Sequence, residues 1–571
     1  MTGGAAAGGD GGNPQGDAAA KAIAAFRARA GDLLAAGGGT PSPALQELAA
    51  GQPQLANLIA VELAQAGRLE EAGSLLRAVL AIAPAEMRRQ VLTNLAFVDR
   101  ARGDYHGAWH WVRRVIALDP QRGLGHAASL AGSAMLAGAH DIFWAANEAV
   151  RALDPDGIRG WSGAYIASEF RIMPGSARPV GRRQLRGAAP AVPGCRGPSP
   201  ARLALIGSEF GRGTSFNRMM GPFRRLAGLG FEVHCLWLRD GLPPDGTGWP
   251  GARFTPVPEG DATALRNALH AIAPDVIVDL ACHAQPQSFA VLAERVAPLQ
   301  LAWSGNAVSS GTDVFDAILT DRAHCPPGAE HHYAGPVLRL PVPSMTVEPE
   351  AADPAPTPLP ADRNGHITFG AFHRLSKVTP EVIALWAEVL LAVPGSRLVM
   401  KTFLLENPRI SGRIAAAFAS HGIGADRLRL LGGSDRESHT RIVADVDLAL
   451  GPFPEQGMVT DFDSFWLGVP TISYGVDDRP CARLAACLSA AAGAPFLATR
   501  SPTGFVAAAR SLAADPGYLR QARPLYRGNL VAAGLTDHQA TAAAIAAAIR
   551  RLWADLPQGG GGYQQTGQQG G

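Results

Sequence analysis

The sequence predicts an all-α region of helical repeats followed by two α/β lobes, each built on a parallel sheet. In the first third of the chain, Gly, Ala and Pro recur at a fixed spacing. Beyond residue 200, short apolar runs alternate with amphipathic segments, a pattern typical of strands joined by crossover helices. The stretches 174–200 and 346–364 are rich in Pro and separate these regions. A chain of 571 residues is also too long for one core, so several domains are expected.

Composition argues against several classes of protein, including nucleic-acid-binding, disulfide-rich and secreted proteins. Charged residues make up 18% of the chain and the net charge is +2, which gives no basis for a nucleic-acid or membrane-surface partner. The six cysteines form no CxxC pair, as expected for reduced thiols. The amino-terminal residues lack the features of a secretion signal, and no run of 18 apolar residues follows. We therefore expect a soluble, cytoplasmic protein, for which the sequence indicates no oligomeric state.

The repeat is visible in three residue types. Gly67, Ala72 and Pro84 recur 36 residues later as Gly103, Ala108 and Pro120, and Gly138 and Pro155 follow 35 residues after that. The Gly is expected to end one helix, the Ala to allow close packing and the Pro to end the second helix. This period is typical of tetratricopeptide-like repeats, with a plain helical bundle as the alternative. Stacked helix pairs present a surface suited to peptides or partner proteins, so this region is predicted to bind a partner.

Composition shifts set the predicted boundaries. The chain is divided into a disordered tail (1–17), tetratricopeptide-like repeats (18–173), a linker (174–200), a first Rossmann-like lobe (201–345), an inter-lobe linker (346–364), a second lobe (365–556) and a Gly/Gln-rich disordered tail (557–571).

The first lobe opens with a predicted strand at 203–206, a helix at 217–229 and a strand at 232–238. The loop after the first strand lacks the GxGxxG fingerprint of dinucleotide sites. A later strand, 276–280, is followed by His283. Ligands of parallel sheets bind beyond the carboxyl ends of the strands, so His283 is a candidate for contact with a ligand or simply a loop residue.

The segment HCPPGAEHHY, residues 324–333, raises the question of a metal site. It holds three His and one Cys, but they lie in adjacent pairs. Neighbouring side chains do not easily converge on one tetrahedral ion. We therefore expect no metal at this segment.

The second lobe begins with a strand that ends in the loop HRLSK, before an amphipathic helix from Pro380. Thr379 is the expected N-cap of that helix. Lys377 therefore lies beside a helix amino terminus, where an ammonium group and the helix dipole together favour a diphosphate. A solvated lysine is the alternative interpretation.

Further along, residues 427–484 read as strand, helix, strand, helix, strand. Asp435 is expected to cap a helix that carries Arg436 and His439 about one turn apart. His439 near a helix start is predicted to be neutral and able to donate to a phosphate. Thr460 and Asp463 lie in the next strand-to-helix connection, and the four side chains together predict a nucleotide-type pocket.

Five stretches in this order resemble the catalytic region of the O-linked N-acetylglucosamine transferases and their SPINDLY-like relatives. They are DVIVDLACHA, RVAPLQLAWSG with a downstream FDAILTD, PPGAEHHY, FGAFHRLSKVTPEVIALWAEVLLAVPGSRL and FPEQGMVTDFDSFWLGVPTI. The resemblance covers residues 201–553, and helical repeats precede that region in the family too. It implies a GT-B type fold, an inverting and metal-independent transfer without a cofactor, and a UDP-sugar donor held mainly by the second lobe.

The resemblance also assigns roles by position. Lys377 matches the lysine that contacts the donor diphosphate, His439 a histidine near the uracil and phosphates, and Arg436 a basic residue near the base. Thr460 matches a hydroxyl of a Thr-rich phosphate loop and Asp463 the acidic residue that holds the ribose. The family commonly has a Gly/Thr-rich run where this chain has GMVTD.

The function expected from these features is transfer of a sugar, most simply N-acetylglucosamine, from UDP to Ser or Thr of a protein selected by the repeats. Lys377 would stabilise the leaving UDP, and His283 is a candidate base. Two alternatives remain at this point: the same fold using another nucleotide sugar or a dedicated target such as flagellin, and an inactive repeat-containing interaction protein.

Overall fold

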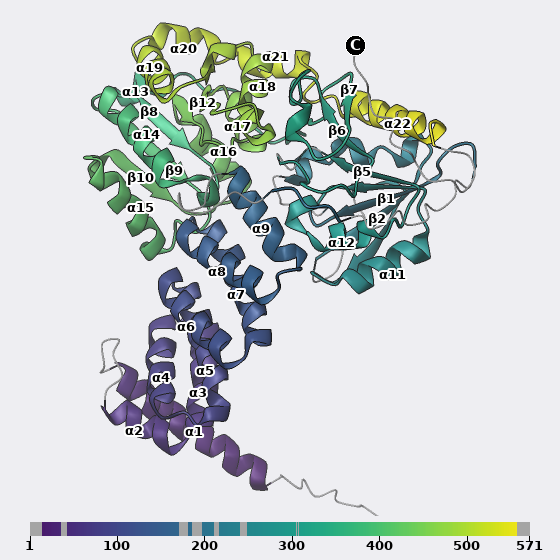
Figure 1. Cartoon of the computed structure of the whole chain (residues 1–571). Helices are drawn as coiled ribbons and strands as arrows, with labels where there is room; N and C mark the ends of the chain where they lie inside the picture. Colours follow the sequence, from purple (N-terminus) through teal and green to yellow (C-terminus); the bar gives the residue numbers. More distant parts are fainter. Residues whose placement is uncertain are drawn as a thin grey trace, which may run out of the picture. The chain divides into compact units, whose positions relative to one another are not determined.

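The computed structural model divides into two units, Met1–Ala134 and Met135–Gly571. Figure 1 shows the chain coloured along its sequence. The predicted amino-terminal tail up to residue 13, most of the 174–200 linker and the tail from 557 onward lie outside the described residues. The structure describes residues 14–35, 43–170, 181–185, 197–210, 216–239, 248–303, 305 and 308–556.

The first unit is helical. Small residues at the predicted positions explain its packing, because Ala72 and Ala108 are fully buried between helices. Gly67 and Gly103 have φ of +77° and +79°, a conformation that glycine adopts without strain as a helix ends. Its helices are α1 (Pro14–Ala35), α2 (Pro43–Gly51), α3 (Pro53–Gln65), α4 (Leu69–Ile82), α5 (Ala85–Ala101), α6 (Tyr105–Leu118) and most of α7 (Pro120–Leu136).

The repeat continues beyond the boundary between the units. Gly138, with φ of +64°, follows α7 and precedes α8 (His140–Leu153), and α9 (Ile158–Glu169) comes after Pro155. Phe143, at the position where the first two repeats have Ala, is buried in α8. Helix–turn–helix units therefore recur at the predicted spacing, as expected for tetratricopeptide-like repeats.

The first lobe contains a seven-stranded parallel sheet in the order β3-β2-β1-β4-β5-β6-β7 among the described residues. Most of these strands are buried on both faces, which explains their continuous apolar runs. The strands are β1 (Arg202–Gly207), β2 (Glu232–Leu238), β3 (Ala252–Val257), β4 (Val276–Asp279), β5 (Leu299–Trp303), β6 (Ala317–Asp321) and β7 (Val337–Leu340).

One predicted helix of this lobe is replaced by shorter turns. The segment expected to form a helix at 217–229 instead contains η1 (Phe216–Met219), α10 (Gly221–Arg224) and η2 (Ala227–Leu229). Pro222 has no N–H for a helical hydrogen bond, and Gly221 before it weakens helix formation, so the helix cannot run through. The remaining short elements and helices are α11 (Ala262–Ile272), η3 (Cys282–Ala284), α12 (Gln287–Ala293) and η5 (Glu330–His332).

The second lobe contains a six-stranded parallel sheet, among the described residues, in the order β10-β9-β8-β11-β12-β13. The strands are β8 (Thr368–Ala371), β9 (Arg397–Lys401), β10 (Leu428–Leu431), β11 (Leu448–Leu450), β12 (Thr471–Tyr474) and β13 (Ala498–Thr499).

Helices surround this second sheet, and several begin at predicted caps. Thr379 Oγ1 accepts a hydrogen bond from the N–H of Val382, and Asp435 accepts one from the N–H of Ser438. The elements are α13 (Ala361–Asn364), η6 (Leu375–Lys377), α14 (Pro380–Ala392), α15 (Pro408–Ser420), η7 (Ala425–Arg427), α16 (Arg436–Ala444), α17 (Val459–Trp466), η8 (Pro480–Ala482), α18 (Leu484–Ala491), η9 (Pro495–Leu497), α19 (Pro502–Ala513), α20 (Pro516–Ala522), α21 (Leu525–Ala532) and α22 (His538–Ala554).

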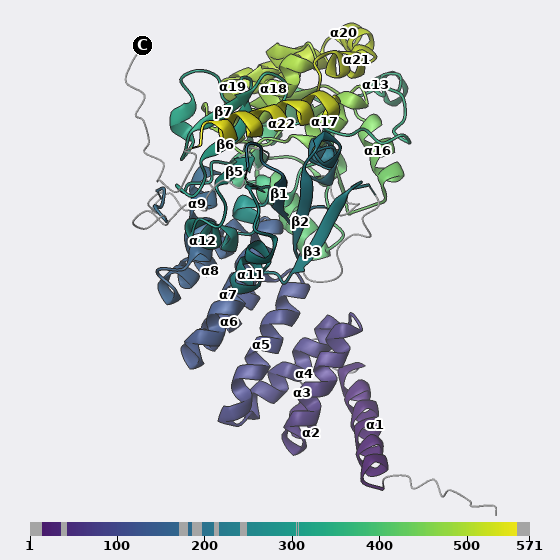
Figure 2. The same ribbon diagram turned by 90° about the vertical axis from the view of Figure 1, so that its right-hand side faces the viewer.

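The last helix returns to the first lobe, although the sequence assigns it to the second. Thr541 Oγ1 donates to the carbonyl oxygen of Pro343 at 2.9 Å, and Arg550 Nη2 donates to the carbonyl oxygen of Leu229 at 2.5 Å. Figure 2 shows α22 beside β6 and β7. No helix in the described part of the chain has both the length and the apolar composition that crossing a membrane requires.

Strand order fixes where a ligand can bind. Each sheet reverses its winding direction once, between β1 and β4 in the first lobe and between β8 and β11 in the second. Loops leaving the carboxyl ends of such neighbouring strands diverge and open a crevice. A ligand site is therefore expected where the two crevices meet.

Candidate functional site

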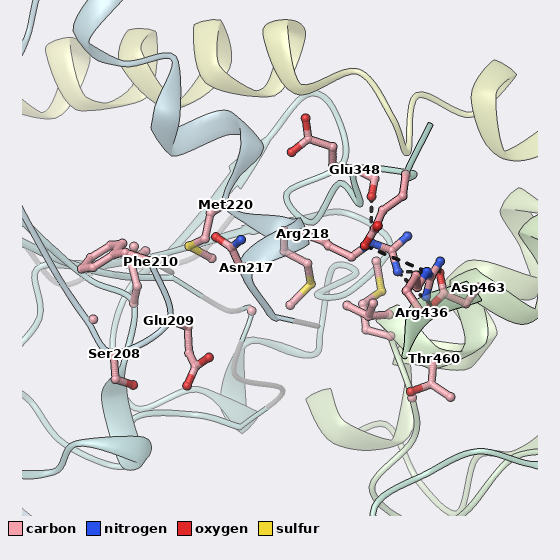
Figure 3. A pocket seen from close by; sticks show the side chains of 18 of the residues that line it. Ser208, Glu209, Phe210, Asn217, Arg218, Met220, Glu348, Arg436, Thr460 and Asp463 are labelled. Carbon is pink, nitrogen blue, oxygen red and sulfur yellow. Dashed lines mark hydrogen bonds and ion pairs between the residues drawn. The ribbon is translucent and has the colours of Figure 1, made fainter. Parts of the chain in front are cut away.

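A cleft of about 2350 Å³ lies at these two crevices. The first lobe lines it with the ends of β1 and β4, including Gly207 and Leu280. The second lobe contributes the loops that follow β8 and β11, which contain Lys377 and Thr460. Figure 3 shows side chains from both lobes pointing into this space. The cleft thus lies at the positions that strand order predicts for a ligand.

Lys377 lies in η6, immediately before α14, and lines the cleft. Its Nζ donates to the carbonyl oxygen of Gln456 at 2.7 Å and lies 3.1 Å from Oε1 of Glu455. The side chain of Gln456 is fully buried and bonded to β12 and α18, through the carbonyl oxygen of Tyr474 and the N–H of Ala485. Lys377 is therefore held against the loop that leads into α17.

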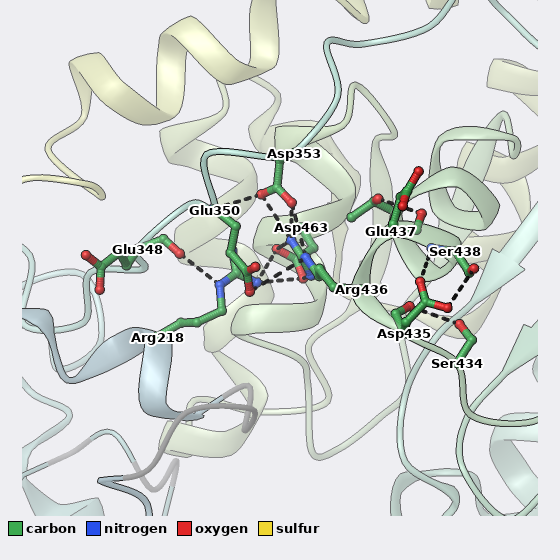
Figure 4. Close-up of polar contacts among 11 residues, drawn as sticks. Arg218, Glu348, Glu350, Asp353, Ser434, Asp435, Arg436, Glu437, Ser438 and Asp463 are labelled. Carbon is green, nitrogen blue, oxygen red and sulfur yellow. Dashed lines mark hydrogen bonds and ion pairs between the residues drawn. The ribbon is translucent and has the colours of Figure 1, made fainter. Parts of the chain in front are cut away.

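Asp463 is shared by two arginines from different lobes (Figure 4). Arg218 of η1 places Nη1 at 2.6 and 2.8 Å from the two carboxylate oxygens, and Arg436 of α16 places Nη1 at 2.6 Å from Oδ2. Arg436 also contacts Asp353 at 2.8 Å. Burial alone would raise the pKa of Asp463, but the two guanidinium groups outweigh it and hold the pKa below its ordinary value.

Asp463, which the sequence predicts to hold the ribose, is thus hydrogen-bonded to two guanidinium groups in this structure. Four hydrogen bonds from Arg218 and Arg436 reach the two oxygens of Asp463. A carboxylate offers about four acceptor positions, so a ribose hydroxyl would have to replace or share one of these bonds. Asp463 and Arg436 both line the cleft, and whether they hold ribose and base stays a prediction.

His439 lies one helical turn after Arg436 on α16 and lines the same cleft. Burial and the neighbouring charge of Lys401 lower its pKa to about 4. The ring is therefore neutral at pH 7, as the sequence predicts. The edge of the ring packs on Phe372, with ring centroids 6.1 Å apart.

Thr460 belongs to the first turn of α17, and its side chain faces the cleft (Figure 3). Met458 and Val459 line the cleft beside it, without hydroxyl groups. The first N–H groups of a helix have no partner within the helix and carry a partial positive charge. The amino end of α17 therefore offers donors to an anion even though two side chains there are apolar.

His283 is placed away from the cleft. Its Nδ1 lies 2.8 Å from Ser162 Oγ of α9, and its Nε2 lies 3.0 Å from the carbonyl oxygen of Ser309. Its ring stacks on Tyr165, and burial lowers its pKa to about 4. Both ring nitrogens are engaged and the cleft is lined instead by Ala281 and Ala284, so this geometry gives no support for His283 as the base.

Two functional candidates were missed from the sequence. Arg218 lies beyond the loop after β1 in a segment with no recognisable motif, so only the fold brings it to Asp463. His373 follows β8 in the same way that His283 follows β4, and it lines the cleft. The strand-end rule that pointed to His283 applies equally to His373, which lies two residues beyond β8 in the loop that also contains Lys377.

The segment 324–333 shows no metal site. His324 Nδ1 pairs with Asp321 at 2.8 Å, whereas His331 is exposed and bonds to the carbonyl oxygen of Gly328. Throughout the described ranges, no three His, Cys, Asp or Glu side chains are grouped to hold a metal ion.

Charge in the cleft suits an anionic ligand. Basic side chains that line it include Arg218, Arg374, Lys377, Lys401 and Arg436. Asp463 and Glu455 hold three of them in place by short contacts. Fixed cations and helix N–H groups of this kind stabilise phosphate groups and the charge that develops on a departing phosphate.

Comparisons with known proteins agree with this geometry. The model of glycosyl transferase family 41 matches residues 358–542. The probable UDP-N-acetylglucosamine–peptide N-acetylglucosaminyltransferase SPINDLY of Oryza sativa subsp. japonica is 29% identical over 280 residues, which are 49% of this chain and 30% of that protein. The similarly named protein SEC of Arabidopsis thaliana is 24% identical over 310 residues, 51% of this chain and 31% of that protein. The chain therefore spans about a third of the length of these curated relatives.

A solved structure extends the likeness to nearly the whole chain. A mutant O-GlcNAc transferase of Thermobaculum terrenum superposes with a TM-score of 0.72 at 25% sequence identity, and the match covers 88% of this chain and 97% of that chain. This likeness confirms the predicted order of helical repeats followed by a two-lobed GT-B type fold. The chain therefore resembles the SPINDLY proteins and the O-GlcNAc transferases, and its residues 358–542 match the model of glycosyl transferase family 41.

Proposed function

We propose that this protein is an inverting glycosyltransferase that moves N-acetylglucosamine from UDP to Ser or Thr hydroxyls of a protein. The observation that carries the proposal is the convergence of Lys377, Arg436, His439, Thr460 and Asp463 on one cleft between two Rossmann-like lobes. The names of the family 41 relatives supply the donor sugar and the peptide acceptor. An acceptor hydroxyl would enter from the first-lobe side of the cleft.

The proposed transfer depends on positive groups held close to the leaving UDP and involves no covalent intermediate with the protein. Lys377 and the amino end of α17 would stabilise the negative charge that builds up on the UDP as its bond to the sugar breaks. Neutral His439 can donate a hydrogen bond to the uracil or a phosphate without adding charge. The transfer is proposed to require no metal and no cofactor, because these groups supply the stabilisation that a divalent cation gives elsewhere.

The acceptor is proposed to be a protein recruited by the helical repeats. Helix pairs such as α3/α4 and α5/α6 stack with exposed apolar side chains, including Leu58 and Phe97. Such surfaces suit extended or helical peptide segments. The described cysteines form no disulfides with one another, which suits a reducing compartment, so we place the reaction in the cytoplasm.

The test compares proteins co-expressed with the wild type and with Lys377→Ala. Lys377→Ala removes the ammonium beside the α17 loop, so we expect sugar transfer to fall at least a hundredfold, an order typical of losing one charge-stabilising group. Mass spectrometry of the co-expressed proteins identifies the sugar and the modified residue. Arg441→Ala, an exposed change on α16, is the matched control.

Undiminished transfer by Lys377→Ala would contradict the assignment of the cleft. A mass increment other than that of N-acetylhexosamine on the modified peptides would contradict the donor. Circular dichroism of both variants checks that each one folds.

A further inference from the structure

A buried pair of ionisable residues lies behind the donor cleft and has no part in the function proposed so far. His373 lies two residues beyond the end of β8, and Asp461 lies in the first turn of α17. Their side chains are only 3% and 1% exposed, and Nε2 of His373 lies 3.2 Å from Oδ1 of Asp461. In the described part of the structure, neither oxygen of Asp461 has a hydrogen-bond partner. The nearby imidazole and the positive amino end of α17 therefore both stabilise the charge of this carboxylate.

The pair packs against the loop that Lys377 holds from its other side. A Cβ added to Gly457 would lie 2.6 Å from Cε1 of His373 and 2.8 Å from Oδ1 of Asp461. Lys377 bonds to the carbonyl of the preceding residue, Gln456. His373 and Lys377 therefore flank the short segment that leads into the amino end of α17, where a diphosphate would bind.

The neighbouring charged groups determine which ring nitrogen of His373 carries a hydrogen. A carboxylate beside Nε2 requires hydrogen on that nitrogen, because two acceptors would repel each other. Of the other acidic groups near this loop, Glu455 is paired with Lys377 at 3.1 Å and Arg374 at 3.3 Å, and Asp463 is paired with Arg218 and Arg436. The remaining site on His373 is Nδ1, for which no hydrogen bond is recorded among the described residues, and the side chain lines the cleft.

We propose that His373, oriented by Asp461, takes up a proton when a nucleotide diphosphate binds and donates Nδ1–H to a phosphate oxygen. This inference rests on the proposed UDP-sugar site. The proton comes from solvent, no covalent bond changes, and the phosphate gains one charge-assisted hydrogen bond. His373 acts on a phosphate and not on the acceptor hydroxyl.

This role accounts for the unusual composition of the loop. Met458 and Val459 present no hydroxyl group at the cleft, so two possible donors to a phosphate are absent there. An imidazolium restores one donor and adds a positive charge. The buried carboxylate of Asp461, which would otherwise oppose an anion nearby, becomes the group that retains the proton on His373.

Isothermal titration of the full chain with UDP tests the proposal. Repeating the titration in buffers with different ionisation enthalpies reports the number of protons taken up per UDP bound. We expect uptake by the wild type near neutral pH and UDP affinity that falls as pH rises from 6.5 to 8.5. His373→Asn should abolish the uptake, flatten the pH profile and weaken binding about tenfold or more.

Two further variants and one ligand control complete the experiment. Asp461→Asn keeps the shape but removes the charge, and it should reduce the uptake and move the pH dependence to lower pH. His421→Asn, at an exposed histidine at the end of α15, should behave as the wild type. Uridine, which has no phosphate, should bind without uptake of a proton.

The outcomes separate the two proposals. UDP binding by the wild type without proton uptake, or unchanged uptake in His373→Asn, overturns the role of His373 and leaves the glycosyltransferase proposal standing. Absence of UDP binding by the wild type at millimolar concentration overturns both. If His373→Asn fails to fold, the Asp461→Asn profile decides, because an unshifted pH dependence there contradicts the pair.

Discussion

Asp463 is the residue through which the two lobes share charge. Arg218 reaches it from the first lobe and Arg436 from the second, and all three line the cleft. Removing a carboxylate from water costs several kcal/mol, which only good hydrogen-bond geometry offsets. The contact therefore makes one lobe electrostatically dependent on the other at the point where the donor is proposed to bind.

Arg218→Met tests this dependence. Methionine keeps most of the apolar stem but removes two short hydrogen bonds to Asp463, which remains paired with Arg436. Loss of hydrogen bonds to a charged group costs about 1.5–3 kcal/mol, and we expect the free energy of unfolding to fall by that amount. Urea denaturation followed by fluorescence measures it.

Arg441→Met is the comparison for this variant. Arg441 bonds to Glu437 at 2.8 Å on the exposed face of α16, and such surface pairs contribute about 0–1 kcal/mol. Equal losses in the two variants would show that Arg218 contributes no more than a surface pair.

Some residues of the candidate site can be predicted from the sequence and others cannot. Lys377, Arg436, His439 and Thr460 follow from local rules, because each lies at a strand end or a capped helix start that the apolar pattern already marks. Arg218 follows from no local rule, since only tertiary folding brings it to Asp463. His283 shows the limit of the strand-end rule: η3 turns the chain after β4, and the ring packs against Tyr165 of α9 instead of the cleft.

At the scale of elements, α8 is linked to the loop that carries Lys377. His140 Nε2, at the first position of α8, lies 3.0 Å from the carbonyl oxygen of Ser376 in η6. Burial lowers the pKa of His140, which favours the neutral ring. Helix α8 thus supports the short 3₁₀ turn from which Lys377 extends.

His140→Ala removes that support without altering the cleft lining. A neutral hydrogen bond contributes about 0.5–1.5 kcal/mol, so we expect UDP affinity to weaken about two- to tenfold. Isothermal titration measures the change. Glu148→Ala, at a half-buried position of the same helix whose side chain pairs with Arg151, should leave the affinity as it is.

If UDP affinity falls in both variants, the effect comes from a general change in α8 and not from the hydrogen bond of His140. If His140→Ala keeps the affinity of the wild type, η6 holds its position without this hydrogen bond.

Sequence patterns predict where helices and strands form better than they predict where those helices and strands are interrupted. Both parallel sheets and the glycine-ended repeat helices follow from periodicity and from Gly, Ala and Pro spacing. The helix expected at 217–229 fails because Pro222 and Gly221 interrupt it, an effect that the apolar pattern conceals. The return of α22 to the first lobe depends on long-range contacts such as that of Arg550 with Leu229, which a local sequence pattern does not predict.

At the scale of the whole molecule, histidines that the fold keeps neutral link stability to pH. His283 in the first lobe and His439 in the second each have a pKa of about 4, mainly because burial disfavours the charged ring. In the unfolded chain their pKa is about 6.5. Between these values the unfolded chain binds protons that the folded chain does not, so stability is full above pH 6.5 and falls as the pH is lowered.

We therefore expect acid to destabilise the protein well before its carboxylates titrate. Lowering the pH from 7.5 to 5.0 should cost about 2 kcal/mol for each of these two histidines. Urea denaturation at both pH values measures the loss in the wild type and in His283→Gln and His439→Gln. Each variant should lose about 2 kcal/mol less than the wild type over this interval, whatever its stability at pH 7.5. His421→Gln, at an exposed position, should follow the wild type, and a full acid loss in both buried variants would show that these rings are not kept neutral by the fold.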